Sequence, residues 1–260
     1  MFKFLDAYSL RARLAPAIIA SAPAIAFVAL LISWSRISVS NTIATLGLAV
    51  LLYALADFAR GRGRRTEPAI YEALGGKPSI TMMRFSDDSF DTQAKTRYHS
   101  FLAGKVDETA PSIADEQKDP AAADRFYDRC GAWLREHTRD AKKFSILFNE
   151  NVTYGYRRNL FAMKWPALAL NLLTVLVSVA ILFAGGPFAG LSAFKSRLVV
   201  VFVVAVIHVL YIGFAVNLAA VGEAAKAYAR QLILSCETLM APAKPVAPKQ
   251  KRASGKAAEN

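Results

Sequence analysis

The chain has 260 residues, a formal net charge of +12 and a mean hydropathy of +0.29. Those values fit together only if the charges are segregated, and four stretches carry no Asp, Glu, Lys or Arg: Leu14–Ser35, Ile37–Ala56, Trp165–Phe194 and Leu198–Gly222. A helix of about 20 apolar residues crosses a bilayer core of about 30 Å, so each stretch is long enough to span. The pattern excludes an ordinary soluble domain and a single-pass anchored enzyme.

The N-terminal part of the chain predicts a surface helix followed by a membrane hairpin. Residues 1–13 mix aromatic, apolar and basic side chains, which predicts an amphipathic helix at the inner membrane surface. Residues 14–59 hold spans 1 and 2, and Pro16 and Pro23 are placed to bend the first of them. The second span leads into a basic exit that Gly61 and Gly63 are expected to loosen.

Residues 60–164 are predicted to form a mostly helical ligand-binding domain in the cytoplasm. Asp91 is placed to cap a helix through Leu102, and Pro120 to open a helix through His137. A third helix is expected from Lys142 into the third span, with apolar side chains at helical spacing.

The remaining segments of this domain lack a helical pattern. Val106–Asp119 is polar and contains a proline, so it predicts a surface loop. Ser79–Phe85 is compatible with a short strand or an extended loop, and the pattern does not choose between them.

The C-terminal part predicts a second membrane hairpin and two cytoplasmic segments. Residues 165–222 hold spans 3 and 4, residues 223–240 continue in helical composition, and residues 241–260 are predicted to be a disordered basic tail. The resulting fold class is an all-α membrane protein, with four transmembrane helices and a cytoplasmic domain inserted between the second and third spans.

Basic residues near the spans predict the orientation. Twelve lie on the side that carries both termini and three on the other, which places both termini in the cytoplasm. Cys130 and Cys236 then lie in a reducing compartment, where a disulfide is disfavoured, and their spacing matches no zinc motif. Cys130 is interpreted as a packed helix residue, and no metal or cofactor is expected.

Basic and aromatic residues alternate in three runs: Lys95–His99, Arg135–Lys143 and Tyr154–Arg158. Single-stranded nucleic acid is bound by positive grooves with aromatic platforms, so the runs favour an anionic ligand such as a nucleotide, an oligonucleotide or a lipid headgroup. The candidate phosphate contacts are Arg84, Lys95, Arg97, His99, Arg139, Lys142, Lys143, Arg157 and Arg158, and the candidate base-stacking residues are Tyr98, Tyr154 and Tyr156.

Polar residues inside the predicted spans are candidates for a pore or gate. Asn171 also stands out there, and ionisable groups in spans usually face water or the bundle interior. Asp57 has the alternative of extending toward Arg60 and Arg62 at the membrane surface. The candidate pore or gate residues are Asp57, His208, Tyr211 and Asn217.

Enzymatic activity is not predicted. Asp87, Asp88 and Asp91 match the DDxxD spacing that holds magnesium in prenyl-transferring enzymes, but no second acidic cluster accompanies them. They are interpreted as a solvated turn and a helix cap. Gly76 and Lys77 lack the spacing of a phosphate-binding P-loop.

Several segments together resemble one known family. They are Phe4–Pro16, Gly76–Arg84, Lys95–Leu102, Trp133–Asp140 and Glu150–Leu160. These segments are similar to the membrane effectors of the bacterial anti-phage defence system called Hailong, over about residues 4–165.

The resemblance implies a homotetrameric ion channel in the bacterial inner membrane. In that family, short single-stranded DNA oligomers made by a partner nucleotidyltransferase hold the channel closed, and their loss opens it and depolarises the membrane. The residues alone leave two alternatives open: a channel that a cyclic nucleotide or oligonucleotide opens, and a non-channel scaffold held at membrane lipids by basic flanks.

Overall fold

The structure is a computed structural model that describes residues 7–31, 39–183 and 192–241. Every regular element in these ranges is a helix, which confirms the all-α fold class for them. Most of the predicted tail, residues 242–260, lies outside the described residues. The elements are α1 Ala7–Ser9, the π-helix η1 Leu10–Leu14, α2 Ala15–Ala20, α3 Ala22–Leu31, α4 Val39–Ala73, α5 Pro78–Thr81, α6 Thr92–Val106, α7 Ile113–Lys118, α8 Pro120–His137, α9 Ser145–Ala162, α10 Lys164–Phe183, α11 Ser192–Leu210, the π-helix η2 Tyr211–Ala215 and α12 Leu218–Met240.

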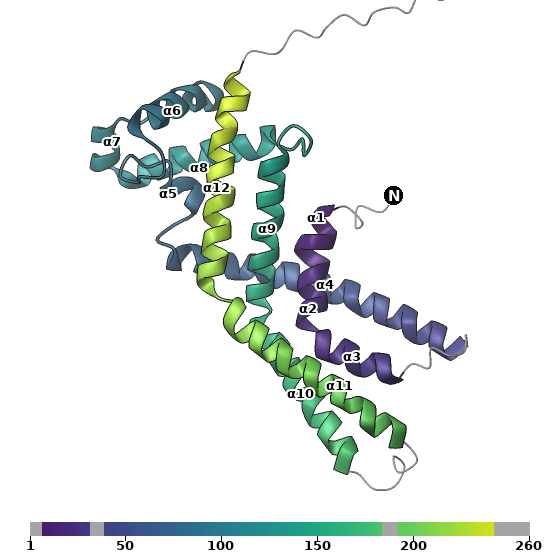
Figure 1. Cartoon of the computed structure of the whole chain (residues 1–260). Coiled ribbons are helices and arrows are strands. Elements are labelled where there is room, and N and C mark those ends of the chain that lie inside the picture. The colour runs from purple at the N-terminus through teal and green to yellow at the C-terminus, as the bar shows by residue number, and fades with distance from the viewer. Residues whose placement is uncertain (1–6, 32–38, 184–191, 242–260) are drawn as a thin grey trace, which may run out of the picture.

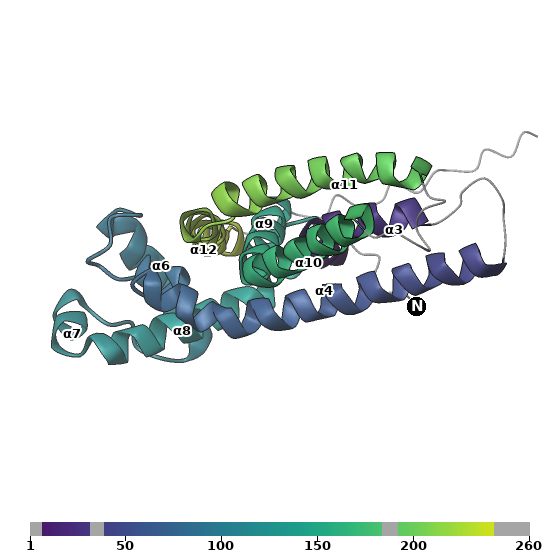
Figure 2. The same ribbon diagram turned by 90° about the horizontal axis from the view of Figure 1, so that it is seen from below.

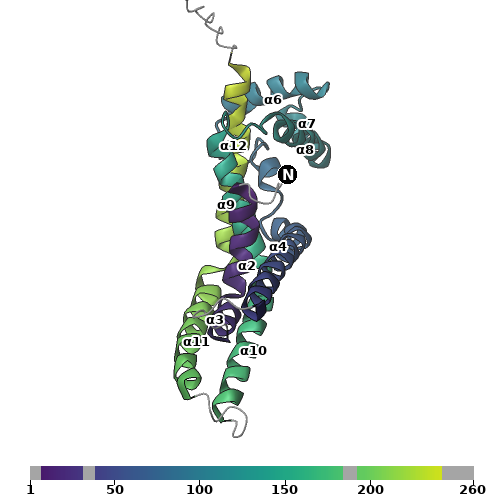
Figure 3. The same cartoon turned by 90° about the vertical axis from the view of Figure 1, so that its right-hand side faces the viewer.

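The helices form an elongated molecule with a polar end and an apolar end. α9 and α12 lie side by side along its middle (Figures 1 and 3). At one end α6 and α8 pack against α12, with α7 against α8, while at the other end α3, α10 and α11 lie together. Figure 2 shows α4 running along one side of the group, past α9 and on toward the apolar end.

Two helices are long and apolar enough to cross a membrane: Lys164–Phe183 and Leu198–Ala215. Leu10–Ala20 and Ala22–Ala29 meet the same criterion only as a pair, bent by 68° at the break between them. The described residues therefore hold two candidate spans, or three if the bent pair is one span, where the sequence predicts four. The other predicted span begins outside the described residues and continues as the N-terminal half of α4.

The bend in the first predicted span follows from its backbone chemistry. Pro23 has no N–H, so the helical hydrogen bond to the carbonyl of Ile19 cannot form. Ser21 leaves the helical region, with φ −107° and ψ 8°, and its hydroxyl donates to the carbonyl of Ala17 at 2.7 Å. The prediction that this span bends is confirmed.

α4 is a single helix of 35 residues that joins the apolar stretch to the basic segment after it. The prediction that Gly61 and Gly63 loosen this segment is wrong, because the helix continues through both and through Pro68. Its middle packs along α9, where Arg62 Nε donates to the carbonyl of Ala162 at 2.8 Å. Tertiary packing thus outweighs the low helix propensity of glycine.

The N-terminal elements pack on the protein itself. η1 and α2 contact α4 and α9, and Ala12 is fully buried there. Gly155 of α9 allows this close approach, because a Cβ at that position would lie 3.1 Å from the Cβ of Ala12. The predicted contact of residues 1–13 with the membrane surface stays a prediction.

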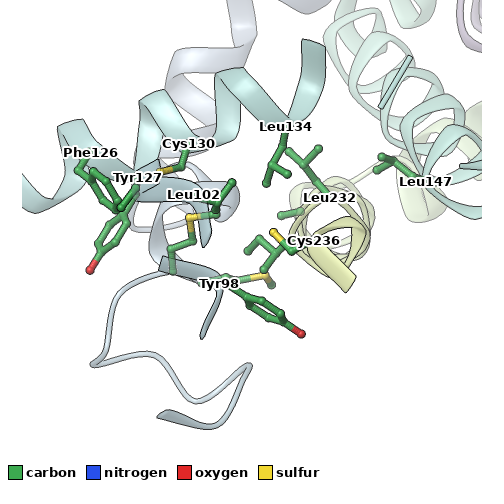
Figure 4. Close-up of a cluster of buried hydrophobic side chains, with 14 of the residues drawn as sticks. Tyr98, Leu102, Phe126, Tyr127, Cys130, Leu134, Leu147, Leu232 and Cys236 are labelled. Atoms are coloured by element: carbon green, nitrogen blue, oxygen red, sulfur yellow. The ribbon is translucent and has the colours of Figure 1, made fainter. Parts of the chain in front are cut away.

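The largest core of the polar end lies where α6, α8 and α12 meet (Figure 4). Leu102, Cys130, Leu134 and Leu232 are at most 1% exposed in it, so the interpretation of Cys130 as a packed residue is confirmed. Since Leu232 belongs to α12, residues after the last predicted span complete a core that begins in the predicted 60–164 domain.

The predicted start of α6 and both predicted ends of α8 agree with the structure, whereas α6 continues to Val106, four residues beyond the predicted end at Leu102. Asp91 caps α6 by accepting from the amide of Ala94 at 2.8 Å, and α8 opens at Pro120 and ends at His137. Asp119 caps α8 in the same way, accepting from the amide of Ala122 at 2.9 Å.

Three local predictions need correction. The predicted loop 106–119 contains α7, which starts with a capping box between Ser112 and Asp115. Residues 78–81 form the short helix α5, so neither a strand nor a fully extended loop occupies 79–85. The helix predicted to run from Lys142 into the third span begins at Ser145 and breaks at Met163, where α9 ends and α10 starts.

Candidate functional site

A cleft opens between the N-terminal elements, α4, α8, α9 and α12. It consists of two adjoining cavities of about 330 and 460 Å³, which share Tyr8, Arg135, Asn151 and Tyr228. The first cavity is also lined by Glu67, Tyr71, Lys77, Pro78, Ser79, Tyr154, Arg158, Ala225 and Ala229, and the second by Thr138, Arg139, Leu147 and Phe148.

A carboxylate network forms one wall of the cleft and joins α4 to α9. Glu67 accepts from Arg158 Nη1 at 2.8 Å, from the hydroxyl of Tyr154 at 2.7 Å and from that of Tyr71 at 3.1 Å. Burial opposes ionisation of Glu67, but the hydrogen bond from Tyr154 and the charge of Arg158 outweigh it and lower the pKa of the carboxyl. Glu67 is therefore ionised at neutral pH, and both tyrosines are protonated donors.

The same network reaches the N-terminal elements. Asn159, next to Arg158 in α9, is 1% exposed and donates to the carbonyl of Ala12 at 2.7 Å. Its Oδ1 accepts from the guanidinium of Arg158 at 3.3 Å. Hydrogen bonds through Asn159 therefore link Arg158 to η1, which continues into α2 and α3.

Arg135 supplies an unengaged positive charge in the cleft. The other basic residues that line it have acidic partners: Lys77 pairs with Asp128 at 2.6 Å, Arg158 with Glu67, and Arg139 with Glu136. Arg135 has no acidic partner among residues 7–31, 39–183 and 192–241. It lines both cavities, so it is the cation best placed to receive an anion.

Tyrosine rings complete the cleft. Tyr154 and Tyr228 are parallel, with ring centroids 6.1 Å apart and an interplanar angle of 5°. Burial raises the pKa of Tyr228, so its hydroxyl stays protonated at neutral pH. Tyr8 adds a third ring that borders both cavities. Cations and flat aromatic faces together suit an anion that carries an aromatic ring.

Three of the predicted ligand contacts line this cleft: Arg139, Tyr154 and Arg158. Lys142 and Lys143 follow the lining residue Arg139 closely in the sequence and are exposed. Their backbone amides donate to the carboxylate of Asp140. Their side chains are therefore available to a ligand that extends beyond the second cavity.

The predicted contacts on and beside α6 have structural partners instead. Arg84 makes a two-point ion pair with Asp124, at 2.6 and 2.8 Å. Lys95 is 2% exposed and donates to the carbonyl of Arg84 at 2.6 Å, and burial lowers its pKa. Neither side chain lines the cleft, so neither is placed to contact a ligand there.

Arg97, Tyr98 and His99 are likewise engaged elsewhere. Arg97 and Tyr98 both bind Glu237 of α12, with the Tyr98 hydroxyl at 2.6 Å. His99 is 2% exposed and lies among the rings of Phe85, Phe126 and Tyr127. These three residues hold the polar end together, and the sequence pattern cannot reveal this because Glu237 lies 139 residues from Tyr98.

Tyr156 and Arg157 lie on α9 away from the cleft. The hydroxyl of Tyr156 is 3.0 Å from that of Tyr211, so a predicted stacking residue meets a predicted pore residue. Arg157 is half-buried, and no acidic partner for it is found in the described ranges.

The other predicted pore residues have different surroundings. His208 is 3% exposed, and its Nδ1 lies 3.1 Å from Nδ2 of Asn171, which also donates to the carbonyl of Ala205 at 3.0 Å. Asn217 caps α12, accepting from the amide of Ala220 at 2.9 Å. Asp57 is exposed on α4.

Sequence reasoning did not select most of the cleft lining. Arg135 lies in one of the basic runs, and Tyr8 in the predicted surface helix, but neither was singled out as a contact. The missed residues share no local motif, since they come from five elements and one loop: Tyr8, Glu67, Tyr71, Lys77, Arg135, Asn151 and Tyr228. Among these missed residues, Arg135 is the one that lies in a predicted basic and aromatic run.

Comparison of the chain with protein-family models, curated proteins and solved structures found no match.

Proposed function

We propose that this chain is a membrane channel whose opening is controlled by a nucleic-acid ligand bound in the cytoplasmic cleft. The bent first span, the N-terminal half of α4, α10 and α11 serve as its four transmembrane helices, with both termini in the cytoplasm. The polar end is the ligand-binding part.

The observation that carries the proposal is the composition of the cleft. Its two cavities, of about 330 and 460 Å³, fall in the range of small-molecule sites, which is about 300–1,000 Å³. Arg135 offers a free cation for phosphate, and Tyr8 and Tyr228 offer faces for bases. The ligand class that uses both is a nucleotide or a short single strand, one or two nucleotides of which occupy the cleft.

The cleft is also placed to act on the membrane helices. Tyr8 borders both cavities, and the elements that follow it, η1 and α2, lead directly into the broken first span. A ligand that binds one arrangement of these elements more tightly shifts the equilibrium toward it.

The family resemblance is the basis for two further parts of the proposal: whether the ligand closes or opens the channel, and which partners take part. A short single-stranded DNA oligomer, produced by a partner nucleotidyltransferase, holds the channel closed, and loss of the oligomer opens it in anti-phage defence. The channel is a homotetramer in the bacterial inner membrane. These statements are supported by the resemblance alone.

Binding of fluorescent single-stranded DNA oligomers to the purified chain tests the ligand. Arg135→Ala should weaken binding by about 10- to 100-fold, since hydrogen bonds to charged groups contribute about 1.5–3 kcal/mol. Arg125→Ala is the matched control, because Arg125 is exposed on the same helix outside the cleft and should leave affinity unchanged. Affinity should also fall with salt, with a logarithmic slope of about −0.7 per phosphate contacted.

Ion flux through proteoliposomes tests the output. The proposal is supported if the protein conducts ions in the absence of the oligomer and if adding the oligomer suppresses this flux. Flux only with a nucleotide ligand would reverse the sign of gating, and no flux under any condition would favour a membrane scaffold. Equal affinities for the two arginine variants would remove the cleft as the binding site.

A further inference from the structure

Three breaks in the helical backbone meet in one buried layer of the chain. α2 gives way to α3 at Ser21, α9 to α10 at Met163, and η2 to α12 at Val216. Side chains at or beside each break pack together with one side chain of α4, and all of them are at most 5% exposed. We call this layer the break layer, and it includes Ala20, Ala59, Met163, Ile212 and Val216.

The break layer separates the apolar end of the molecule from the polar end. The candidate span Lys164–Phe183 begins directly after the second break, and the candidate span Leu198–Ala215 ends directly before the third. At the first break the helix axis bends by 68°. Figure 1 shows α9 and α10, and likewise α12 and α11, pointing in different directions on the two sides of the layer, whereas α4 crosses it as one helix.

A basic side chain of α4 occupies the carbonyl that the second break leaves free. Pro166 has no N–H, so the carbonyl of Ala162 lacks its usual helical donor. Arg62 Nε donates to this carbonyl at 2.8 Å. The break between α9 and α10 is therefore fastened to α4.

Lys164 occupies the free carbonyls at the third break. η2 ends at Ala215, and Val216 and Asn217 are extended, with φ values of −96° and −141°. The carbonyls of Gly213 and Val216 accept from Nζ of Lys164 at 3.3 and 2.8 Å. Because Lys164 is the first residue of α10, one side chain ties the second break to the third.

The break layer and the cleft use the same helices. Glu67 of α4 accepts from Arg158 of α9 in the wall of the cleft, and Arg62 of α4 donates to Ala162 of α9 at the break layer. α12, which starts just after the third break, carries Tyr228 into the cleft. A ligand in the cleft thus contacts the helices whose ends meet at the breaks.

We infer that the three breaks form one hinge, that Lys164 holds this hinge in the arrangement of this structure, and that ligand binding in the cleft moves the membrane helices through it. Hinges are a few residues at the ends of elements that absorb changes in φ and ψ while the helices beside them move as rigid bodies. The part played by the ligand rests on the proposed function and names how that function is regulated, whereas the hinge itself does not depend on it.

Hydrogen exchange of the full-length chain in detergent tests the hinge without ligand. Lys164→Met removes both donated hydrogen bonds and keeps an unbranched side chain, so amides in residues 213–221 should exchange about tenfold faster, since bonds to charged groups contribute that factor or more. A single hinge opens all three breaks together, so residues 20–25 and 160–167 should exchange faster as well.

Lys226→Met is the matched control, because Lys226 is exposed on α12 outside the cleft and should leave all three segments unchanged. Amides of α8 should keep their wild-type protection, which separates opening of the hinge from loss of the fold. If Lys164→Met also exposes α8, Lys164→Gln, which keeps an uncharged donor, should give a smaller acceleration at the same three segments. Faster exchange in residues 213–221 alone, or in none of the segments, overturns the hinge.

A fluorescent single-stranded DNA oligomer tests whether the ligand acts through the hinge. Its binding should change exchange at the three breaks by at least about fivefold, which is the lower end of common coupling between sites. Lys164→Met should change the oligomer concentration that halves ion flux by about tenfold relative to Lys226→Met.

Oligomer binding that alters neither the exchange at the breaks nor this concentration overturns the role of the hinge in regulation and leaves the proposed function standing. If the oligomer does not bind to the wild-type chain, the proposed function fails, whereas exchange of the ligand-free variants still decides the hinge. The two failures are thereby distinguishable.

Discussion

Single residues show how far burial changes the role that a side chain can take. His99 stands in a run of basic and aromatic residues that predicts a phosphate contact, yet it is 2% exposed among three aromatic rings. Burial lowers its pKa to about 4, although the charge of Glu116 favours the protonated form. The neutral imidazole packs among aromatic rings in the core and is not placed to bind phosphate.

Acid should therefore destabilise the fold through His99. The folded pKa of about 4 lies below the unfolded value of 6.5, so the unfolded state takes up the proton first. The contribution of neutral His99 to the free energy of unfolding is complete above pH 6.5. It is lost as the pH falls toward 4, by up to about 3 kcal/mol. Melting temperatures across this range should fall less steeply for His99→Phe than for the wild type.

His137→Gln is the control for this experiment, because His137 is exposed and stacks on Trp133. It should keep the wild-type slope. Identical slopes for all three proteins would show that His99 does not titrate differently in the folded state.

Individual helices depend on their neighbours for their length. α4 continues through Gly61 and Gly63 because α9 packs against it, and the two glycines differ in what surrounds them. A Cβ at Gly63 would lie 2.1 Å from Oδ1 and 3.2 Å from Cα of Asn159, whereas a Cβ at Gly61 would meet nothing within 4 Å. Gly63 is thus needed for the approach of two helices, and Gly61 is not.

Alanine at these two positions should have opposite effects on stability. Gly63→Ala should destabilise the protein by about 1–3 kcal/mol, because Asn159 must shift and weaken its bond to Ala12. Gly61→Ala should be neutral or stabilise by up to about 1 kcal/mol, because alanine is the better helix former. Thermal unfolding of the two variants in detergent measures both, and equal melting temperatures would contradict the close α4–α9 packing.

The assembled chain unites segments that are far apart in sequence. The core of the polar end takes Leu102 from α6, Leu134 from α8 and Leu232 from α12, so residues on both sides of the last two predicted spans are needed to close it. The cleft has the same property, because Tyr8 and Tyr228 both line it. The polar end therefore cannot be separated from the membrane part without loss of its core.

Truncations should reveal this dependence. A chain ending at Ala241 keeps all of α12 and should elute and melt like the wild type in fluorescence-detected size exclusion. A chain ending at Tyr228 removes Leu232, Ile233 and Cys236 from the core, and each large apolar deletion costs about 2–5 kcal/mol. Their sum approaches the whole stability of a domain, about 5–15 kcal/mol, so this chain should aggregate. Native-like elution of the shorter chain would refute the shared core.

Local patterns predicted most of the features that have a local cause. The bounds of α8, the cap at Asp91 and the bend before Pro23 each follow from chemistry within a few residues, and each was predicted. α7 was missed although Ser112 and Asp115 form a capping box, because its six residues were interpreted as part of a polar loop. The apolar stretches were identified by length and composition, although the described residues hold two or three candidate spans where four were predicted.

Charges were the hardest feature to interpret, because the effect of a charge depends on what lies beside it in space. The sequence alone indicated an all-helical membrane protein with a basic and aromatic polar part, since hydropathy, periodicity and capping act over short distances. Whether Arg84 is paired with Asp124 and Arg135 is free became visible only in the folded chain. Contacts between distant segments decide which charges are paired, which side chains are buried and how closely Tyr8 approaches α12. These contacts therefore distinguish a structural ion pair from a candidate binding site.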